Sequence, residues 1–259
     1  MNKKFTLISG PCAVEELDTC LKIAKEVKAI TQKLGIRYIF KASYKKANRT
    51  SLNSFTGIEE DEALNILKTV GEEVGVECIT DIHESKDPPK VSQYVDHLQI
   101  PAFLCRQTDL LLAAGESGCG INIKKGQFLS PEAMKFPLEK VLSTGNQQVW
   151  LCERGTTFGY QDLIVDATSI ARMKEHGAPV IMDCTHATQK PNRTVGTTGG
   201  DPEMIETLAL SAVATGADGL FIETHPNPSV ARSDSATMLS LEHMEGLLEK
   251  IMKVRKALY

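Results

Sequence analysis

Residues 5–34 read FTLISGPCAVEELDTCLKIAKEVKAITQKL and contain one strand followed by one helix. The apolar and β-branched run Phe5–Ser9 is typical of a buried strand. After it, apolar residues recur at i, i+3 and i+4 spacing, which predicts a helix with one buried face. These residues are Leu17, Cys20, Leu21, Ala24, Val27 and Leu34.

The same unit recurs along the chain. Further apolar runs predict strands at Arg37–Ala42, Glu77–Thr80, His97–Ile100, Gly120–Lys124, Gln148–Cys152, Pro179–Asp183 and Gly219–Glu223. A last helix repeats the spacing of the first from Leu241 to Val254. Strands that alternate with helices predict right-handed βαβ units and a parallel sheet. Eight units in 259 residues fit an α/β fold, the (β/α)8 TIM barrel, which takes roughly 250 residues.

An open doubly wound sheet is the competing architecture. It usually has fewer strands and a glycine-rich first turn, whereas the turn here reads Ser9-Gly10-Pro11-Cys12 and lacks GxGxxG. Neither a linker nor a shift in composition interrupts the chain, so residues 1–259 are predicted to form one domain.

Composition excludes several classes of protein. With 42% hydrophobic and 24% charged residues, the chain is too apolar to be disordered. Its apolar runs are all shorter than the roughly 18 residues of a membrane helix. A net charge of −4 argues against non-specific nucleic-acid binding. The N-terminus does not resemble an export signal, and the seven cysteines lack CxxC spacing, so we expect reduced thiols and a cytoplasmic location.

Reactive residues follow the predicted strands, at the end of a barrel where catalytic groups lie. In chain order they are Cys12; Lys41, Lys45, Lys46, Asn48 and Arg49; Asp81 and His83; Gln99 and Arg106; Lys124 and Lys125; Glu153 and Arg154; Asp183 and His186; and Glu223 and His225. One lysine after a strand is most often a solvated loop charge. Six or seven cations on one rim of an acidic protein instead predict anionic substrates that carry phosphate or carboxylate groups.

A second group combines one thiol, one imidazole and two carboxylates: Cys12, His186, Glu223 and Asp234. Such ligands suit a divalent transition metal, although they lie on three different loops and form no local motif. The alternative for Cys12 is a small buried apolar residue. Cys184 is expected in the core, and His97, His176 and His243 are expected to be structural or exposed. The charge run Glu59–Glu62 is expected to be the solvated start of a helix.

Eight motifs resemble those of 3-deoxy-D-manno-octulosonate 8-phosphate synthases, in register from residue 5 to about 255. They are SGPCAVE (9–15), FKASYKKANRTS (40–51), TDIHE (80–84), QIPAFLCRQTDL (99–110), NIKKGQF (122–128), ERGTTFGY (153–160), DCTH (183–186) and ETHPNP (223–228).

The resemblance implies a TIM barrel, usually tetrameric, that condenses phosphoenolpyruvate with arabinose 5-phosphate on the pathway to lipopolysaccharide. It implies that Lys41, Lys46, Lys124 and Arg154 hold phosphoenolpyruvate, and that Asn48, Arg49 and Thr50 hold the sugar phosphate. It places Asp81 and Gln99 near the sugar hydroxyls and the reacting carbons, and Arg106 against the sugar phosphate of a neighbouring subunit. Lys41, Lys46, Asp81 and His186 are the expected catalytic residues.

The residue at position 12 determines whether the resemblance implies a metal. In this family the residue after Gly-Pro is Cys in metal-dependent members and Asn in metal-independent ones. The resemblance therefore implies a metal bound by Cys12, His186, Glu223 and Asp234. This ligand set suits Zn, Fe, Mn or Co, and the sequence does not choose among them.

The chain departs from the family pattern at several positions. Lys45 replaces a common Asp, Thr50 a common Ser, and Thr56-Gly57-Ile58-Glu59 a common Arg-Gly-Pro-Gly, while the loop Gln189–Gly200 has fewer glycines than usual. A related synthase that uses erythrose 4-phosphate usually has Lys-Pro-Arg-Thr where this chain has Lys41-Ala42-Ser43-Tyr44. Two further alternatives are a Schiff-base aldolase that uses Lys124 and a barrel that only senses a phosphosugar.

Overall fold

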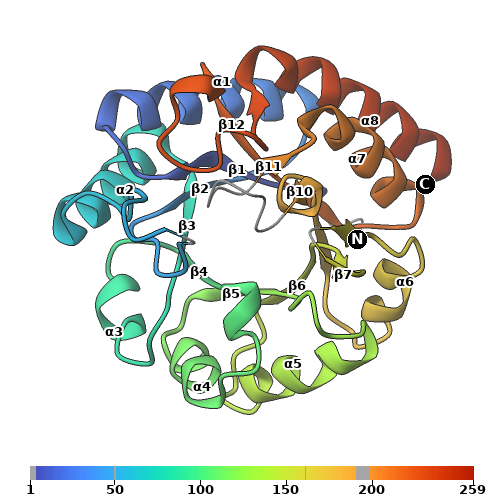
Figure 1. Cartoon of the computed structure of the whole chain (residues 1–259), viewed down its shortest axis with the longest axis horizontal. Helices are drawn as coiled ribbons and strands as arrows, with labels where there is room; N and C mark the ends of the chain where they lie inside the picture. The colour runs from blue at the N-terminus through green and yellow to red at the C-terminus, as the bar shows by residue number, and fades with distance from the viewer. Residues whose placement is uncertain (1–3, 50, 161, 191–198) are drawn as a thin grey trace.

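The structure is a computed structural model that describes residues 4–49, 51–160, 162–190 and 199–259. Eight parallel strands form its centre: β1 (Thr6–Ala13), β2 (Arg37–Ser43), β3 (Glu77–Asp81), β4 (His97–Ile100), β5 (Gly120–Lys124), β6 (Val149–Glu153), β9 (Val180–Asp183) and β12 (Gly219–His225). Each strand pairs with the next, and β12 pairs with β1, so the sheet closes into the predicted barrel (Figure 1). All eight predicted strands are confirmed, and β1 continues past its predicted end at Ser9 to Ala13.

Helices surround the barrel and cover its outer face (Figure 1). They are α1 (Leu17–Leu34), α2 (Glu60–Val74), α3 (Pro88–Val91), α4 (Thr108–Glu116), α5 (Lys135–Leu142), α6 (Ser169–Lys174), α7 (Ile205–Ala214) and α8 (Met244–Leu258). The charge run behaves as predicted, because α2 starts with Glu60, Asp61 and Glu62 at the positive end of its dipole. Among the described helices, none has both the length and the apolar character that a bilayer crossing requires.

Short elements extend the loops at the carboxyl ends of the strands. They are β7 (Thr156–Thr157), β8 (Leu163–Ile164), β10 (Gln189–Lys190), β11 (Gly199–Gly200), β13 (Leu239–Ser240) and the 3-10 turns η1 (Ala102–Leu104), η2 (Glu132–Met134), η3 (His186–Thr188), η4 (Pro202–Met204), η5 (Pro228–Val230) and η6 (Leu241–His243). His243 therefore precedes the last helix, and it is exposed as expected. Residues 191–198 of the Gln189–Gly200 loop lie outside the described part, so the expectation for that loop stays a prediction.

The barrel interior has an apolar layer below a polar one. Ile8, Ile39, Ile79, Trp150, Cys152, Ile181 and Phe221 form the apolar layer. Because side chains alternate along a strand, the residue two positions further on faces the same interior. Two residues after Ile39, Ile79, Ile181 and Phe221 come Lys41, Asp81, Asp183 and Glu223, all buried. The apolar layer therefore closes the barrel beneath the ionisable groups.

The residues expected to be structural lie as predicted. Cys184 is fully buried, and His97 is buried with its ring against Trp150 and its Nε2 atom 3.2 Å from Glu77. His176 is half-buried, with its Nε2 atom 3.1 Å from the carbonyl oxygen of Pro131. All seven cysteines are free thiols.

Candidate active site

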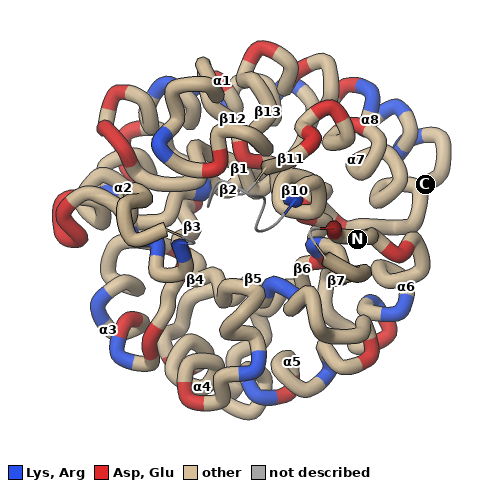
Figure 2. The backbone as a smooth tube through the Cα atoms, in the orientation of Figure 1, with Lys and Arg blue, Asp and Glu red and all other residues tan. Residues whose placement is uncertain are grey.

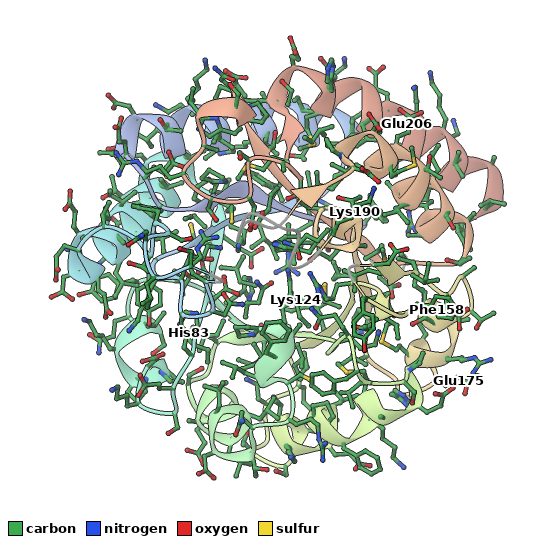
Figure 3. The ribbon with its side chains drawn as sticks, viewed as in Figure 1. His83, Lys124, Phe158, Glu175, Lys190 and Glu206 are labelled. Carbon is green, nitrogen blue, oxygen red and sulfur yellow. The ribbon has the colours of Figure 1, made fainter. Side chains whose placement is uncertain are left out.

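A cavity of about 700 Å³ lies at the carboxyl ends of the strands, where the sequence predicts the site. Most of the predicted site residues line it: Lys41, Lys46, Asn48, Arg49, Asp81, Gln99, Lys124, Arg154, His186 and Asp234. Figure 3 shows Lys124 near the centre of the barrel. Figure 2 shows Lys and Arg positions around the inside of the barrel as well as on the outer helices. A second cavity, of about 460 Å³, lies at the opposite end around Trp150 and contains none of the predicted site residues.

Lys41 lies at the floor of the cavity, and its ammonium contacts three oxygen atoms. Its Nζ atom is 2.9 Å from Glu223 Oε1, 3.1 Å from the carbonyl oxygen of Cys12 and 3.5 Å from Asp81 Oδ2. The contacts with Glu223 and with the Cys12 carbonyl are hydrogen bonds, and the contact with Asp81 is an ion pair. Lys41 therefore neutralises two buried carboxylates that belong to different strands, β3 and β12.

Asp81 is the centre of a polar network. Ser43 and Gln99 donate to its two oxygens, the Gln99 Nε2 atom from 2.6 Å, and Lys46 donates to Ser43 from 2.9 Å. Burial opposes ionisation of Asp81, but the ammonium groups of Lys41, Lys46 and Lys124 outweigh it and lower the pKa of Asp81. The carboxylate is therefore charged and held in one orientation.

Lys124 and His186 share one buried acceptor, Asp183. The Oδ2 atom of Asp183 is 2.5 Å from Lys124 Nζ and 2.8 Å from His186 Nδ1. Its Oδ1 atom accepts the backbone N–H groups of Thr185 and His186. A carboxylate only accepts hydrogen bonds, so the short contact requires the His186 proton on Nδ1. The Nε2 atom of His186 then faces the other side, where Glu223 and Asp234 lie.

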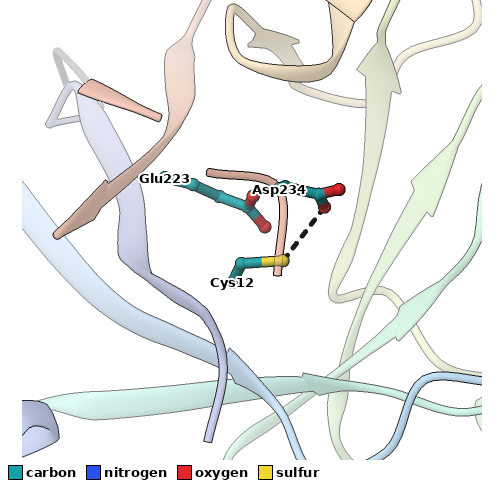
Figure 4. A group of neighbouring side chains, drawn as sticks. All are labelled: Cys12, Glu223 and Asp234. Atoms are coloured by element: carbon teal, nitrogen blue, oxygen red, sulfur yellow. Dashed lines mark hydrogen bonds between the residues drawn. The ribbon is translucent and has the colours of Figure 1, made fainter. Parts of the chain in front are cut away.

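Cys12, Glu223 and Asp234 form a compact group that could hold a metal ion, because one ligand atom from each lies within 4.8 Å of the others (Figure 4). The Cys12 thiol donates to Asp234 Oδ2 from 3.1 Å. Glu223 Oε2 is buried and has no hydrogen-bond partner among the described residues. An unpaired buried carboxylate oxygen beside a thiol and a second carboxylate fits a cation.

Protonation of Cys12 agrees with such a site. Burial raises the pKa of the Cys12 thiol, and the carboxylates of Asp234 and Glu223 raise it further. The thiolate therefore needs a cation beside it, and binding a metal would release the proton. The alternative that Cys12 is merely a buried apolar residue does not explain the two carboxylates that face it.

His186 lies beside this group without belonging to it. Its Nε2 atom is 3.6 Å from Glu223 Oε2 and 3.6 Å from Asp234 Oδ2. The structure thus brings three of the four predicted ligands into one group and places the fourth at its edge.

The backbone at the group is strained. Within the described ranges, Cys12 and Asp234 are the non-glycine residues with positive φ, 64° and 50°. This left-handed region is unfavourable for side chains with a Cβ atom, and such strain clusters at functional sites. At Cys12 it coincides with a shift in the β1–β2 register between Ser9 and Cys12. The chain therefore accepts a local cost to present these two side chains.

Arg49 and Arg154 reach the cavity from opposite sides. Arg49 donates to Ser233 and to the carbonyl oxygen of Phe55, and its Nη1 atom is 3.8 Å from Asp234. The Nη2 atom of Arg154 donates to the carbonyl oxygen of His186 from 3.2 Å and to Gln189 from 2.6 Å. Its Nη1 atom is buried and has no partner in the described part of the chain.

Among the described residues, three predicted site residues are absent from the cavity lining: Cys12 and Glu223, which lie in the group beside it, and Arg106. Arg106 is exposed on the loop after β4 and is absent from the cavity lining. Thr50 lies outside the described residues. Lys45, which departs from the family pattern, pairs with Glu60 at the start of α2, 2.8 Å away. The substituted position thus fastens the β2–α2 loop to a helix rather than facing the cavity.

The sequence prediction missed several polar residues that support the site. Ser43 joins Lys46 to Asp81, Asn122 donates to Gln99, and Ser233 lies between Cys12 and Arg49. Ser43 and Asn122 had a detectable signal, because each lies two positions from a predicted lysine on the same strand. Ser233 had none, since its contacts depend on the path of a loop.

Known proteins resemble this chain along nearly its whole length. Residues 1–259 match the model of the DAHP synthetase I family. A 2-dehydro-3-deoxyphosphooctonate aldolase of Cyanothece sp. is 48% identical over 254 residues, which are 98% of this chain and 93% of that protein. Proteins of the same name from Bartonella henselae and Acidithiobacillus ferrooxidans are each 47% identical over 96% of this chain and 89% of their own length. The chain therefore belongs to the DAHP synthetase I family and to the 2-dehydro-3-deoxyphosphooctonate aldolases that it matches along nearly its whole length.

Proposed function

We propose that this protein condenses phosphoenolpyruvate with D-arabinose 5-phosphate and water to give 3-deoxy-D-manno-octulosonate 8-phosphate and inorganic phosphate. The observation that carries the proposal is the near-full-length match to aldolases named for the same eight-carbon product. The cation-rich cavity supports it, because the two substrates bring two phosphates and one carboxylate. We further propose that residues 1–259 act as one catalytic domain, in the cytoplasm, for lipopolysaccharide biosynthesis.

The proposed phosphoenolpyruvate site uses Lys46, Lys124 and Arg154, with Lys41 beneath them. Arg154 supports this role with a buried Nη1 donor that has no partner among the described residues. Lys124 lies 3.9 Å from the centre of the Phe221 ring, at the boundary of the apolar layer, where a charge is weakly screened. Asn48, Arg49 and Thr50 are proposed to hold the sugar phosphate at the rim.

The reaction forms one carbon–carbon bond and breaks one carbon–oxygen bond. The C3 carbon of phosphoenolpyruvate attacks the aldehyde carbon of the open-chain sugar, and positive charge develops at C2. Water adds to C2 and loses a proton, and the aldehyde oxygen gains one. The C2–O bond to phosphate then breaks as the new C2 hydroxyl becomes the C2 carbonyl, and the hydroxyl proton leaves with the inorganic phosphate. The side chains supply position and electrostatic stabilisation, with Asp81 and Gln99 oriented toward the sugar and the reacting carbons.

A divalent metal, Zn, Fe, Mn or Co, is proposed as the cofactor, held by Cys12, Glu223, Asp234 and, as the fourth ligand, His186. A bound divalent ion would supply Lewis-acid chemistry, by polarising or orienting the sugar aldehyde or by lowering the pKa of a water molecule. Asp183 supports the role of His186, because it holds the proton on Nδ1 and leaves Nε2 for the metal side. His186, Lys41, Lys46 and Asp81 are the proposed catalytic residues.

The active species is proposed to be a homotetramer in which Arg106 reaches the sugar phosphate of a neighbouring subunit. Exposed aromatic side chains near this rim, Phe103, Phe128 and Phe158, support contact with another copy of the chain. The exposed position of Arg106 supports a role outside its own cavity.

Phosphate release tests the proposed reaction. The purified protein is incubated with phosphoenolpyruvate and either arabinose 5-phosphate or erythrose 4-phosphate, and inorganic phosphate is measured. Release with the five-carbon sugar supports the proposal, and a preference for the four-carbon sugar supports the related synthase. Borohydride trapping with substrate would identify a Schiff base at Lys124. Binding without phosphate release would identify a sensor.

A further inference from the structure

The turn that carries Arg154 rests on a buried ion pair that the proposed chemistry does not use. Lys125 and Glu153 are 0% and 1% exposed, and their Nζ and Oε1 atoms are 3.3 Å apart. Lys125 directly follows strand β5, and Glu153 is the last residue of the neighbouring strand β6. A buried charge costs several kcal/mol unless it is paired, and an apolar pair of similar size is often as stable. Stability alone is therefore a weak reason for this pair.

Glu153 holds the turn from one side. Its Oε1 atom accepts the backbone N–H of Arg154 from 2.9 Å and that of Gly155 from 2.6 Å. Its Oε2 atom accepts from the hydroxyl of Ser169, the first residue of α6. Two consecutive backbone N–H groups are thereby hydrogen-bonded to one buried carboxylate, which the Ser169 hydroxyl also holds.

Lys125 holds the same turn from the other side. Its Nζ atom donates to the carbonyl oxygen of Gly155 from 3.2 Å and to the Thr156 hydroxyl from 3.0 Å. Gly155 has φ of +87°, a conformation that favours glycine. Both polar backbone groups of Gly155 are thus bonded to the buried pair. The backbone next to Arg154 has little freedom to rotate.

Arg154 depends on this support. Its guanidinium is held at Nη2 by His186 and Gln189, both on the loop after β9. Its side chain lines the cavity but is only 4% exposed, so a shift of its backbone would move the guanidinium relative to a ligand in the cavity. A misplacement of about 1 Å in a group that orients a substrate costs up to about 100-fold in rate.

We infer that Lys125 and Glu153 are positioning residues that fix the turn 153–156 and so hold Arg154 in its anion-binding position. The inference rests on the proposed function, in which Arg154 binds phosphoenolpyruvate. Neither residue lines the cavity, so both act through Arg154.

The experiment compares steady-state kinetics of Lys125→Met, Arg154→Ala and the double variant. Lys125→Met is expected to raise the KM for phosphoenolpyruvate about tenfold or more, with a much smaller change in the KM for arabinose 5-phosphate. In the double variant the KM for phosphoenolpyruvate is expected to stay within about twofold of Arg154→Ala alone, because the two residues act in series. Independent, multiplying losses would overturn the inference, as would equal losses for both substrates.

Lys174→Met is the matched control. Lys174 also donates to a glycine carbonyl, that of Gly216, and pairs with a carboxylate, Asp218, but at the opposite end of the barrel. Its KM values should match the parent. If Arg154→Ala leaves the phosphoenolpyruvate KM unchanged, the proposed role of Arg154 fails. If Arg154→Ala raises it and Lys125→Met does not, only the positioning inference fails.

A gentler pair of variants keeps the test valid if Lys125→Met does not fold. Glu153→Gln retains an acceptor for the two backbone N–H groups, whereas Glu153→Ala removes it. The alanine variant should raise the KM for phosphoenolpyruvate well above that of the glutamine variant. Equal values in the two variants would contradict the inference.

Discussion

Replacing Asp183 with asparagine removes the carboxylate that orients His186 and pairs with Lys124. Asparagine has the shape of aspartate, and its oxygen still accepts the backbone N–H groups that Oδ1 accepts now. Its NH2 group replaces Oδ2 and faces two donors, Lys124 Nζ at 2.5 Å and His186 Nδ1 at 2.8 Å. His186 relieves the clash by moving its proton to Nε2, which removes the lone pair offered to a metal.

The size of the effect follows from these contacts. Loss of a partner that orients a histidine ligand lowers metal affinity by about 10- to 100-fold, which is about 1.4–2.7 kcal/mol. Lys124 also loses its carboxylate while it remains buried, and such a loss costs about 3–5 kcal/mol in the free energy of unfolding. Asp183→Asn should therefore weaken metal binding and lower the melting temperature of the metal-free protein.

The assay titrates chelator-treated protein with Co2+ or Zn2+ in the presence of a competing chelator and follows the thiolate–Co2+ absorption. Asp218→Asn is the control, since Asp218 also accepts a backbone N–H, that of Val180, and pairs with a lysine, but lies far from the cavity. Unchanged Co2+ affinity in Asp183→Asn, together with lost affinity in Cys12→Ala, would refute the argument that Asp183 orients His186.

Four further predictions follow from the site and the barrel. Arg49→Ala should raise the KM for the sugar phosphate far more than that for phosphoenolpyruvate, because a charge-assisted contact is worth roughly 1.5–3 kcal/mol; the reverse would exchange the two phosphate sites. Mixed oligomers of inactive Arg106→Ala and Lys124→Ala subunits should regain partial activity. If hybrids verified by mass spectrometry show no activity, a site shared between subunits is excluded. Prolonged chelation should abolish activity, added Mn2+ or Zn2+ should restore it, and Cys12→Ala should stay inactive; full activity without metal would return Cys12 to a structural role. Hydrogen bonding from His97, then from Arg37, lowers the pKa of Glu77 from 4.5 to about 2, so this carboxylate stabilises the fold above pH 4.5 and loses that effect as the pH falls toward 2; Glu77→Gln should flatten urea-measured stability across that window, and an unchanged slope would contradict it.

The strands were predictable because their signal is local. The alternating segment Gly120–Lys124 predicts a strand, and the alternation places Asn122 and Lys124 on the interior face. The approximate location of the site was also predictable, because the carboxyl ends of all eight parallel strands lie at the same end of the barrel.

The contacts within the site were not predictable in the same way. Arg49 beside Asp234, and Ser233 beside Cys12, join loops that are far apart in the sequence. Their distances depend on backbone conformations, such as the positive φ of Asp234, that no periodic pattern encodes. The shared use of Asp183 by Lys124 and His186 likewise arises only when β5 and β9 lie in one barrel.

The pairing of β1 with β12 has a consequence for how the protein matures. Cys12 lies on the first barrel strand to be synthesised and Glu223 on the last, and these two strands form the seam that closes the ring. A nascent chain that ends before Gly219 has one residue of the Cys12, Glu223 and Asp234 group and cannot assemble it. Loading of a metal there would therefore wait until synthesis is nearly complete. A bound ion would then link the first and last barrel strands and oppose separation of β1 from β12 during unfolding.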